Sequence, residues 1–459
     1  MEERSLKFVA EACAAEIRGG AGDLKIKNVC TDSRLAKAGD IFFAIKGEKF
    51  DGHEFVNEVA GKGVAAVVVE KSKAQSPKCA VLAVADVRVA LGKLAAAYRR
   101  DFSPPLIVVG GSNGKTTTKE MLACILRQKF PTLWSEASFN NDIGVPMTLL
   151  RLDQTHQAAV LEAGTNHPGE LAPLVKMIAP KFGIITNIGR EHLEFFGDVA
   201  GVAREEGWLA ELLPADGKLF INGDNAWSEK IIARAKAKAV RVGLGGKNDW
   251  CAKKIRLDKN GVTFQVEAPL AELSGEYRIN LLGRHQVTNA LLAIAAAAEL
   301  GLSRNEIQRG LNENKAAKMR LQFWEANGVR VLDDAYNANA DSVIAALETL
   351  CDLPLQGRRV AILGDMAELG AHSTAAHAEV GRRAAELKIG QLFAVGKNSA
   401  ITAQAARDAG LTRVIEFADV EMAVTAVRKF LRTGDVVLLK ASRSSRLERI
   451  AETLKAEKS

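Results

Sequence analysis

Aromatic residues are scarce in this sequence: Phe, Trp and Tyr together make up 5% of its 459 residues, and Tyr occurs only three times. Alanine is frequent instead, and this balance favours a helix-rich α/β architecture over an all-β one. No apolar run is long enough to cross a bilayer. The amino-terminal stretch carries early acidic residues and no long apolar segment, so we expect a helix there rather than a signal peptide, and a soluble cytoplasmic protein.

Closely spaced cysteines are also missing, since no pair has the C-x-x-C spacing of many metal and redox sites. Scattered single cysteines are typical of reduced thiols in a cytosolic protein, so we expect neither a disulfide framework nor a zinc site. The six cysteines are Cys13, Cys30, Cys79, Cys124, Cys251 and Cys351.

Positive charge is in modest excess, with 62 Lys and Arg against 55 Asp and Glu and a formal net charge of +7. The basic residues form no block and no stripe interleaved with aromatics, so we expect no nucleic-acid partner. Two interpretations stay open. The charge is either an ordinary basic surface or a field that concentrates an anionic, phosphorylated substrate.

A chain of this length exceeds what one hydrophobic core usually organises, so we expect more than one domain. Its composition divides it into three blocks. Residues 1–84 contain short β-like runs, and residues 85–315 and 316–459 each alternate strands with helices. That alternation predicts mainly parallel sheets, and a Rossmann-like fold for the last block. We predict an α/β protein with a small amino-terminal domain, a central domain and a carboxy-terminal Rossmann-like domain.

The most specific motif, GGSNGKTT, lies between the apolar run LIVVG and a helical stretch. This context is that of a phosphate-binding loop, in which backbone N–H groups and a helix N-terminus surround phosphate oxygens. Lys115 would reach the β and γ oxygens, and the Thr116 hydroxyl would ligate Mg²⁺. The spacing is one residue shorter than the common form. The predicted nucleotide-binding residues are Gly111, Ser112, Asn113, Gly114, Lys115, Thr116 and Thr117.

Polar residues follow two later strands of the central block. Glu162 ends the run AAVLE, and His192 lies just past FGIITNIG. Ligands collect at the carboxyl ends of strands in open α/β sheets. A carboxylate and a neutral imidazole near a triphosphate could hold a second Mg²⁺ with water, so we predict that both are catalytic and metal-binding. Taken singly, either would equally suit a solvated polar position.

Together these motifs resemble those of the Mur ligases: GSNGKTT, then E-x-G at 162–164, then N-I-x-x-x-H-L-E at 187–194. The stretches SFNNDIGVP, DDAYNAN and GDMAELG are similar to the branch that joins D-alanyl-D-alanine to UDP-N-acetylmuramoyl tripeptide. The likeness runs from Thr31 to about Glu448. The D-N-P-R-type signature of the diamino-acid-adding branch is missing from the last third.

The resemblance implies an ATP- and Mg²⁺-dependent amide ligase of peptidoglycan precursor synthesis. ATP would convert the peptide carboxylate to an acyl phosphate, and the amine of D-alanyl-D-alanine would displace phosphate. We expect a monomer whose site is divided between domains, with closure about a hinge near residues 313–319. The remaining alternatives are a mechanical or regulatory NTPase, a nucleic-acid-binding protein suggested only by the +7 charge, a folylpolyglutamate synthetase and another Mur ligase.

Residue by residue, the resemblance implies a pocket for the uridine diphosphate end in the first block. Arg34 and Lys46 would pair with the diphosphate, and Ser33 would hydrogen-bond to it. A helix or turn cap at Asp32-Ser33 is the structural alternative. Asn140 and Asn141 would face the sugar and the peptide.

The other implied roles fall later in the chain. Asn289 matches an adenine contact, Arg320 a catalytic arginine near the phosphates, and Asp334 a ribose-binding carboxylate. Further residues implied around the nucleotide, the dipeptide and the reacting carboxylate are Tyr336, Asn337, Asp365, Glu368, Ser442 and Arg443.

The sequence departs from the family pattern in one place that bears on the metal. Many relatives carry a carbamoylated lysine that shares a magnesium, but here no lysine lies between Lys181 and Lys218. We hypothesise that Glu206 supplies the carboxylate directly. An exposed acidic helix face is the alternative.

Overall fold

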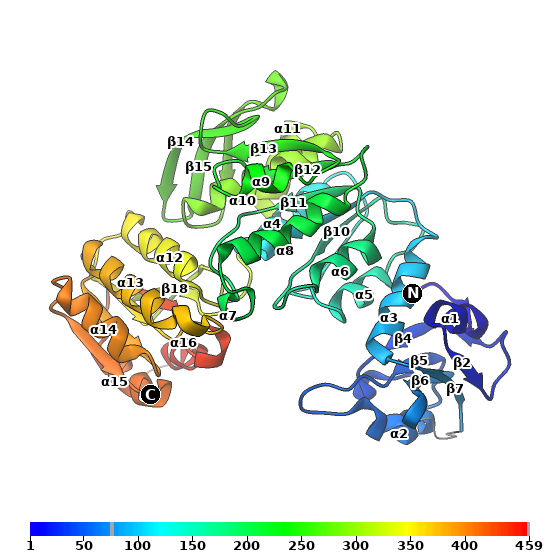
Figure 1. Cartoon of the computed structure of the whole chain (residues 1–459). Coiled ribbons are helices and arrows are strands. Elements are labelled where there is room, and N and C mark those ends of the chain that lie inside the picture. Colours follow the sequence, from blue (N-terminus) through cyan, green and yellow to red (C-terminus); the bar gives the residue numbers. More distant parts are fainter. Residues whose placement is uncertain (74–77, 457–459) are drawn as a thin grey trace. The chain divides into compact units, whose positions relative to one another are not determined.

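The computed structural model describes residues 1–73 and 78–456. Contacts within the chain separate two units, of which the first comprises residues 1–108, 130–165 and 170–182. The second comprises residues 109–129, 166–169 and the chain from 183 onward. Each unit combines helices with sheets of mostly parallel strands, so the predicted α/β class is confirmed (Figure 1). The domain boundaries proposed after residues 84 and 315 stay a prediction.

Unit 1 contains a sheet with the order β2-β7-β6-β5-β4. β2 runs antiparallel to β7, and the other neighbours are parallel. The apolar runs predicted as strands in the first block are β5 and β6, which are buried because both of their faces are covered. The strands are β2 (Glu16–Arg18), β4 (Asn28–Cys30), β5 (Asp40–Phe43), β6 (Ala66–Glu70) and β7 (Ala80–Val84).

Helix α3 (Val87–Arg99) is the central helix of unit 1. Asp86 caps its start by accepting a hydrogen bond from the N–H of Val89, as a residue with an oxygen side chain does at a helix N-terminus. The helix packs against α1, α5 and α6. Other helices of this unit are α1 (Leu6–Cys13), α5 (Gly144–Leu149), α6 (Leu171–Ile178) and α2 (Val56–Gly61), the last of which shares a core with the sheet through Val56 and Val59. A short ribbon is formed by β1 (Arg4–Ser5) and β3 (Lys25–Ile26).

The sheet that carries the glycine motif has the order β16-β15-β14-β13-β12-β11-β8-β10-β9. The predicted strands of the central block are present as β8, β10 and β11. The antiparallel strands β14, β15 and β16 at one edge were not predicted. The strands are β8 (Leu106–Gly110), β9 (Thr132–Trp134), β10 (Ala158–Glu162), β11 (Phe182–Ile185), β12 (Lys218–Asn222), β13 (Lys238–Gly243), β14 (Trp250–Asp258), β15 (Gly261–Glu267) and β16 (Gly275–Ile279).

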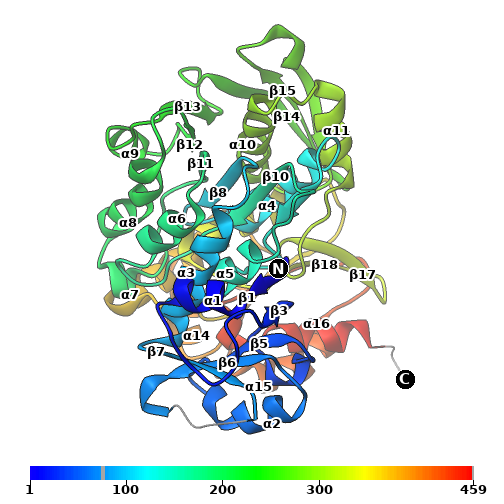
Figure 2. The ribbon, with the colours of Figure 1, turned by 90° about the vertical axis from the view of Figure 1, so that its right-hand side faces the viewer.

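In unit 2 the helix after the glycine motif, α4 (Lys115–Leu126), packs against α10 (His285–Glu299) and α11 (Arg304–Glu313). Figure 2 shows α10 beside β14 and β15. α10 is buried on nearly all sides, because its run of alanines lets neighbouring elements approach closely. The other helices before residue 300 in this unit are α7 (Leu193–Phe196), α8 (Val199–Leu212) and α9 (Ser228–Ile232).

The last third of the chain forms a sheet with the order β17-β18-β22-β19-β20-β21, in which only β17 is antiparallel to its neighbour within the described residues. Helices α12 and α13 share one core with it, and α15 and α16 share another on the opposite face, as expected for a doubly wound fold. The strands are β17 (Gln322–Ala326), β18 (Val329–Asp334), β19 (Arg359–Leu363), β20 (Gln391–Val395), β21 (Val414–Phe417) and β22 (Val436–Lys440). The helices are α12 (Ala340–Asp352), α13 (Ser373–Glu386), α14 (Ser399–Asp408), α15 (Val420–Phe430) and α16 (Glu448–Lys455).

No helix among residues 1–73 and 78–456 is long and apolar enough to span a membrane.

Candidate active site

The glycine motif forms a tight loop between β8 and α4. Gly111 and Gly114 have φ angles of +106° and +88°, which residues with a side chain rarely adopt. A Cβ atom at Gly111 would collide with Thr186, and one at Gly114 would collide with the side chain of Asn289. Both glycines are therefore required by the backbone conformation and by close packing.

Backbone N–H groups of the loop bind the end of β11 and a buried carboxylate. Asn187 accepts from Ser112 through its carbonyl oxygen at 2.9 Å and from Asn113 through Oδ1 at 2.7 Å. Glu206 accepts from the N–H of Gly111 at 2.7 Å. Helix α4 then begins at Lys115 with no side-chain cap from any described residue. An uncapped helix N-terminus beside a glycine loop is suited to bind an anion such as phosphate.

Lys115 is folded back over the loop. Its ammonium donates to the carbonyl oxygens of Gly111 at 2.5 Å and Ser112 at 3.2 Å, and it pairs with Glu191 Oε2 at 3.2 Å. Neighbouring Thr116 is 3% exposed, in the first turn of α4. The predicted phosphate-binding lysine thus lies at the loop, paired with a carboxylate that sequence analysis did not single out.

Glu206 is a fully buried carboxylate beside the loop, with 0% exposure. Its Oε1 has no hydrogen-bond partner in the described part of the chain. Burial raises the pKa of Glu206 to about 8, with Glu191 adding to the rise and Lys115 opposing it. The alternative of an exposed acidic helix face is therefore wrong for Glu206. A buried oxygen without a partner is the kind of group that a bound cation would satisfy.

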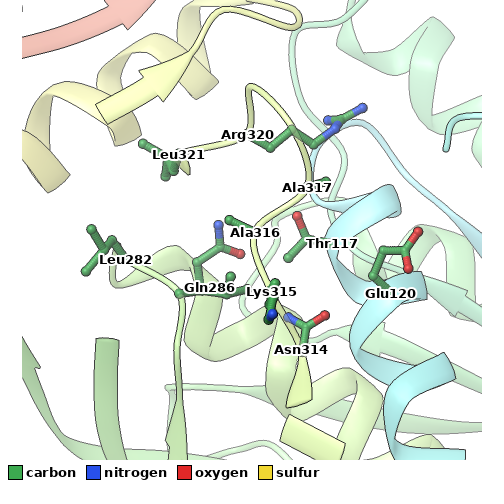
Figure 3. Close-up of a pocket in the computed structure, with 11 residues that line it drawn as sticks. Thr117, Glu120, Leu282, Gln286, Asn314, Lys315, Ala316, Ala317, Arg320 and Leu321 are labelled. Atoms are coloured by element: carbon green, nitrogen blue, oxygen red, sulfur yellow. The ribbon is translucent and has the colours of Figure 1, made fainter. Parts of the chain in front are cut away.

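A small pocket adjoins α4 and the linker after α11. Figure 3 shows Thr117 and Glu120 from α4, Gln286 from α10 and Arg320 from the linker around it. The Arg320 guanidinium lies 4.2 Å from the centre of the Tyr336 ring, in a cation–π contact. Two of the predicted nucleotide-binding residues, Thr117 and Arg320, therefore line one pocket of unit 2. The remaining lining residues are Leu281, Leu282, Asn314, Lys315, Ala316, Ala317 and Leu321.

Asn289 does not line this pocket, although it was predicted to contact adenine. It donates to Gln286 Oε1 at 2.9 Å, is 8% exposed, and packs against Gly114. Asp334 pairs with Lys440 at 2.7 Å and accepts from the N–H of Leu321 at 3.0 Å. Its predicted role at a ribose would require sharing or exchanging these partners.

The other residues predicted in the last third lie mainly in a network of loops. Ser442 is 3% exposed and joins two loops: it accepts from the N–H of Ala367 at 2.9 Å and donates to the carbonyl of Ala338 at 3.2 Å. Asp365 accepts backbone hydrogen bonds from Lys397 and Asn398, each at 2.9 Å.

These contacts give Ser442 and Asp365 structural roles in the loops. Asn337 accepts from the Lys440 ammonium through its carbonyl oxygen at 2.8 Å. Arg443 pairs with Glu448 at 3.4 Å.

The segment after β11 is tied to the last third of the chain within unit 2. Arg190 pairs with Asp341 at 2.6 Å and with Glu379. His192 is hydrogen-bonded through Nδ1 to Glu368, which lowers the pKa of that carboxyl. This Nδ1 is therefore occupied, so a metal would have to bind His192 through the other ring nitrogen. The link through Arg190 was not predicted.

In unit 1, Glu162 ends β10 with 1% exposure. It accepts from Asn140 Nδ2 at 2.8 Å, and its Oε2 has no partner among the described residues. Asn140 thus orients the predicted metal-binding carboxylate. Asn141 instead accepts from the N–H groups of Ile143 and Gly144, which stabilises the turn before α5.

The predicted uridine diphosphate residues lie on exposed loops of unit 1. Arg34, whose side chain is 84% exposed, pairs with Asp32 at 2.6 Å and lowers the pKa of that carboxyl to about 2. Asp32 also caps the following turn by accepting from the N–H of Arg34, so the turn cap considered as the alternative at Asp32-Ser33 is present. Lys46 accepts from Arg88 through its carbonyl oxygen at 3.2 Å.

The predicted metal-binding set is divided: Glu162 belongs to unit 1, and Thr116, His192 and Glu206 belong to unit 2. Among residues 1–73 and 78–456, no cluster of three or more His, Cys, Asp or Glu side chains has a metal-binding arrangement.

Comparison with known proteins identifies the family. Three family models match in chain order: the Mur ligase family catalytic domain over residues 25–99, the Mur ligase middle domain over 109–297, and the glutamate ligase domain of Mur ligases over 319–443. The UDP-N-acetylmuramoyl-tripeptide–D-alanyl-D-alanine ligase of Escherichia coli (strain K12) is 36% identical over 458 residues, which cover 98% of each chain. The chain belongs to the Mur ligase family.

Solved structures of the family share the fold along the whole chain. The MurF structure from Acinetobacter baumannii (crystal structure I) has a TM-score of 0.90 at 34% identity and covers 99% of this chain and 100% of its own. The MurF ligase from Thermotoga maritima in complex with ADP has a TM-score of 0.82 at 26% identity, with 93% and 97% coverage. The resemblance inferred from the motifs is therefore confirmed.

Proposed function

We propose that this Mur ligase joins D-alanyl-D-alanine to UDP-N-acetylmuramoyl tripeptide, with ATP converted to ADP and phosphate. The observation that carries the proposal is full-length similarity, at 36% identity, to an Escherichia coli ligase whose name states these two substrates. The Thermotoga maritima relative was crystallised with ADP, which supports ATP as the nucleotide. All six cysteines are free thiols, which fits action in the reducing cytoplasm.

The chemistry begins with an oxygen of the tripeptide carboxylate, which attacks the γ-phosphorus of ATP while ADP leaves. The amine of D-alanyl-D-alanine then attacks the carbonyl carbon of this acyl phosphate. Phosphate departs with one former carboxylate oxygen, and the nitrogen loses a proton. Positioning and charge neutralisation dominate such a reaction, because all the reacting partners are anionic or polar.

The residues of the loop and the pocket supply those functions in our proposal. Lys115 would leave its carbonyl partners to neutralise the β- and γ-phosphates, and Arg320 would move from the Tyr336 ring to the developing charge. The uncapped start of α4 would bind phosphate oxygens through backbone N–H groups. Thr117 and Gln286, which line the small pocket, would contact the nucleoside.

Magnesium fits the donors that the chain presents. Buried carboxylate oxygens without partners occur at Glu206 Oε1 and Glu162 Oε2 in the described chain, and hard cations prefer oxygen ligands. We propose metal-binding roles for Glu206, Thr116 and His192 of unit 2 and, separately, for Glu162 of unit 1. When bound, magnesium neutralises phosphate charge and orients the transferred group.

The substrate assignment is tested by phosphate release from ATP and UDP-N-acetylmuramoyl tripeptide against a panel of amines. D-Alanyl-D-alanine should give rapid release and a pentapeptide product, whereas glutamate, single D-alanine and L-alanyl-L-alanine should give little. Equal release without any amine would favour a regulatory or mechanical NTPase. A preference for glutamate with a folate acceptor would favour a folylpolyglutamate synthetase.

A further inference from the structure

The segment after β11 holds a buried carboxylate that the proposed reaction leaves without a role. Glu191 is 6% exposed, and its Oε2 lies 3.2 Å from the Lys115 ammonium. Its Oε1 has no hydrogen-bond partner within the described residues. A buried carboxylate therefore holds the lysine that is expected to bind phosphate.

Lys115 has three donor hydrogens, and in this structure carbonyl oxygens of the loop also accept from it. Gly111 accepts at 2.5 Å and Ser112 at 3.2 Å, together with Glu191. Phosphate oxygens of a nucleotide would need the same donors. Nucleotide binding thus requires Lys115 to exchange an existing buried ion pair for a new one.

The backbone around Glu191 is fixed by its neighbours on both sides. The N–H of Gly189 donates to Ser112 Oγ at 2.9 Å, and the N–H of Arg190 donates to Asp341 Oδ2 at 2.8 Å. On the other side, His192 is hydrogen-bonded to Glu368. Because this segment is held and the lysine side chain has four rotatable bonds, Lys115 is the partner that moves.

We propose that Glu191 is a positioning residue: it keeps Lys115 on the loop when the nucleotide is absent and competes with phosphate for that lysine. It thereby lowers nucleotide affinity and favours the release of ADP after each turnover. This inference rests on the proposed nucleotide site.

The expected change in ADP affinity comes from repulsion between the Glu191 carboxylate and the phosphates. When phosphate takes Lys115, the Glu191 carboxylate stays buried beside an anion. Like charges that are partly desolvated repel strongly. Removing the charge of Glu191 should therefore tighten binding of ADP about tenfold.

The test compares ADP dissociation constants of the full-length wild-type protein, Glu191→Gln and Glu191→Ala by isothermal titration calorimetry. Titration in EDTA removes any contribution from metal ligation. Both variants should bind ADP about tenfold more tightly, a gain that damage to the fold cannot produce. Glu191→Asp, which keeps the charge, should bind close to wild type, and so should Glu325→Gln, a matched change at an exposed residue.

Unchanged or weaker binding by Glu191→Gln and Glu191→Ala would overturn this role. Loss of affinity confined to titrations with magnesium would overturn it as well, because it would make Glu191 a metal ligand. If the wild-type protein fails to bind ADP even with magnesium, the proposed nucleotide site itself is wrong. That result differs from one in which wild type and variants bind ADP with equal dissociation constants, which would overturn only the role of Glu191.

Discussion

Asn339 donates through Nδ2 to Asn113 Oδ1 at 2.9 Å, so the phosphate loop is hydrogen-bonded to the Asp-Asp-Ala-Tyr-Asn-Ala-Asn motif 226 residues later. Asn339 is also the N-cap of α12, where its Oδ1 accepts from the N–H of Ser342 at 2.9 Å. The Asn339 side chain therefore caps the N-terminus of α12 and also joins the phosphate loop to the later motif.

Substitutions of Asn339 should separate these two functions. Asn339→Ser keeps a capping oxygen but cannot reach Asn113, so its unfolding free energy should stay near wild type while turnover falls. Asn339→Ala loses the cap as well, and it should lower the unfolding free energy by about 1 kcal/mol. Urea unfolding and steady-state assays on both variants measure this. Equal turnover in wild type and Asn339→Ser would show that the link does not matter for catalysis.

Lys115→Ala should lower turnover by at least about 10²–10³-fold, because it removes the main cation beside the phosphates. The loop itself should persist, since Gly111, Ser112 and Asn113 keep their backbone partners Glu206 and Asn187. Steady-state phosphate release measures the loss, and thermal unfolding controls for damage to the fold. Near-normal turnover would contradict the assignment of the loop.

Glu206→Gln should raise the magnesium concentration needed for half-maximal activity and lower turnover, because an amide is a weaker ligand for a hard cation. Glu205→Gln, the same change at the preceding residue of α8, is the matched control, and the Glu205 carboxylate accepts from the N–H of Gly169 at 2.9 Å. Magnesium titrations of both variants decide the point. If Glu206→Gln keeps wild-type magnesium dependence and turnover, the hypothesis about this carboxylate fails.

Stability should depend on pH through His285 at the start of α10. Burial lowers the pKa of His285 from 6.5 to about 4, while Asp334 and Glu348 oppose this change and Lys440 adds to it. Between those values the unfolded chain binds more protons than the folded chain, so the free energy of unfolding falls as the pH falls from 6.5 towards 4. The full loss is at most about 3 kcal/mol.

His285→Gln lacks this titration. Urea unfolding of wild type and variant at several pH values should give a difference in unfolding free energy that shrinks, or reverses sign, as the pH approaches 4.5, a value chosen to lie inside the window of about 4 to 6.5. A difference that stays constant with pH would show that His285 does not titrate in this range.

Local motifs allowed much of the fold to be predicted. A contiguous sequence pattern predicts the strand that ends at Gly110, the glycine loop and α4. The apolar runs of β18, β19, β20 and β22 indicate a buried parallel sheet. The edge strands β14, β15 and β16 were missed because they are partly exposed and their alternation is weak.

The site was predicted less completely than the fold. Arg190 meets Asp341 and Glu379 across 151 and 189 residues, and no periodicity in a single sequence indicates such pairs. Glu191 lies next to His192 within a recognised motif, but only its burial and its contact with Lys115 indicate a role. Glu206 was singled out because a lysine was missing.

The most direct test of the account follows the oxygen of the activated acid. UDP-N-acetylmuramoyl tripeptide labelled with oxygen-18 in its terminal carboxylate is incubated with ATP, D-alanyl-D-alanine and the protein, and the released phosphate is examined by mass spectrometry. The account predicts that each phosphate carries one labelled oxygen, because the γ-phosphoryl group is transferred to the carboxylate before the amide forms. Unlabelled phosphate, with product formed or not, would contradict it.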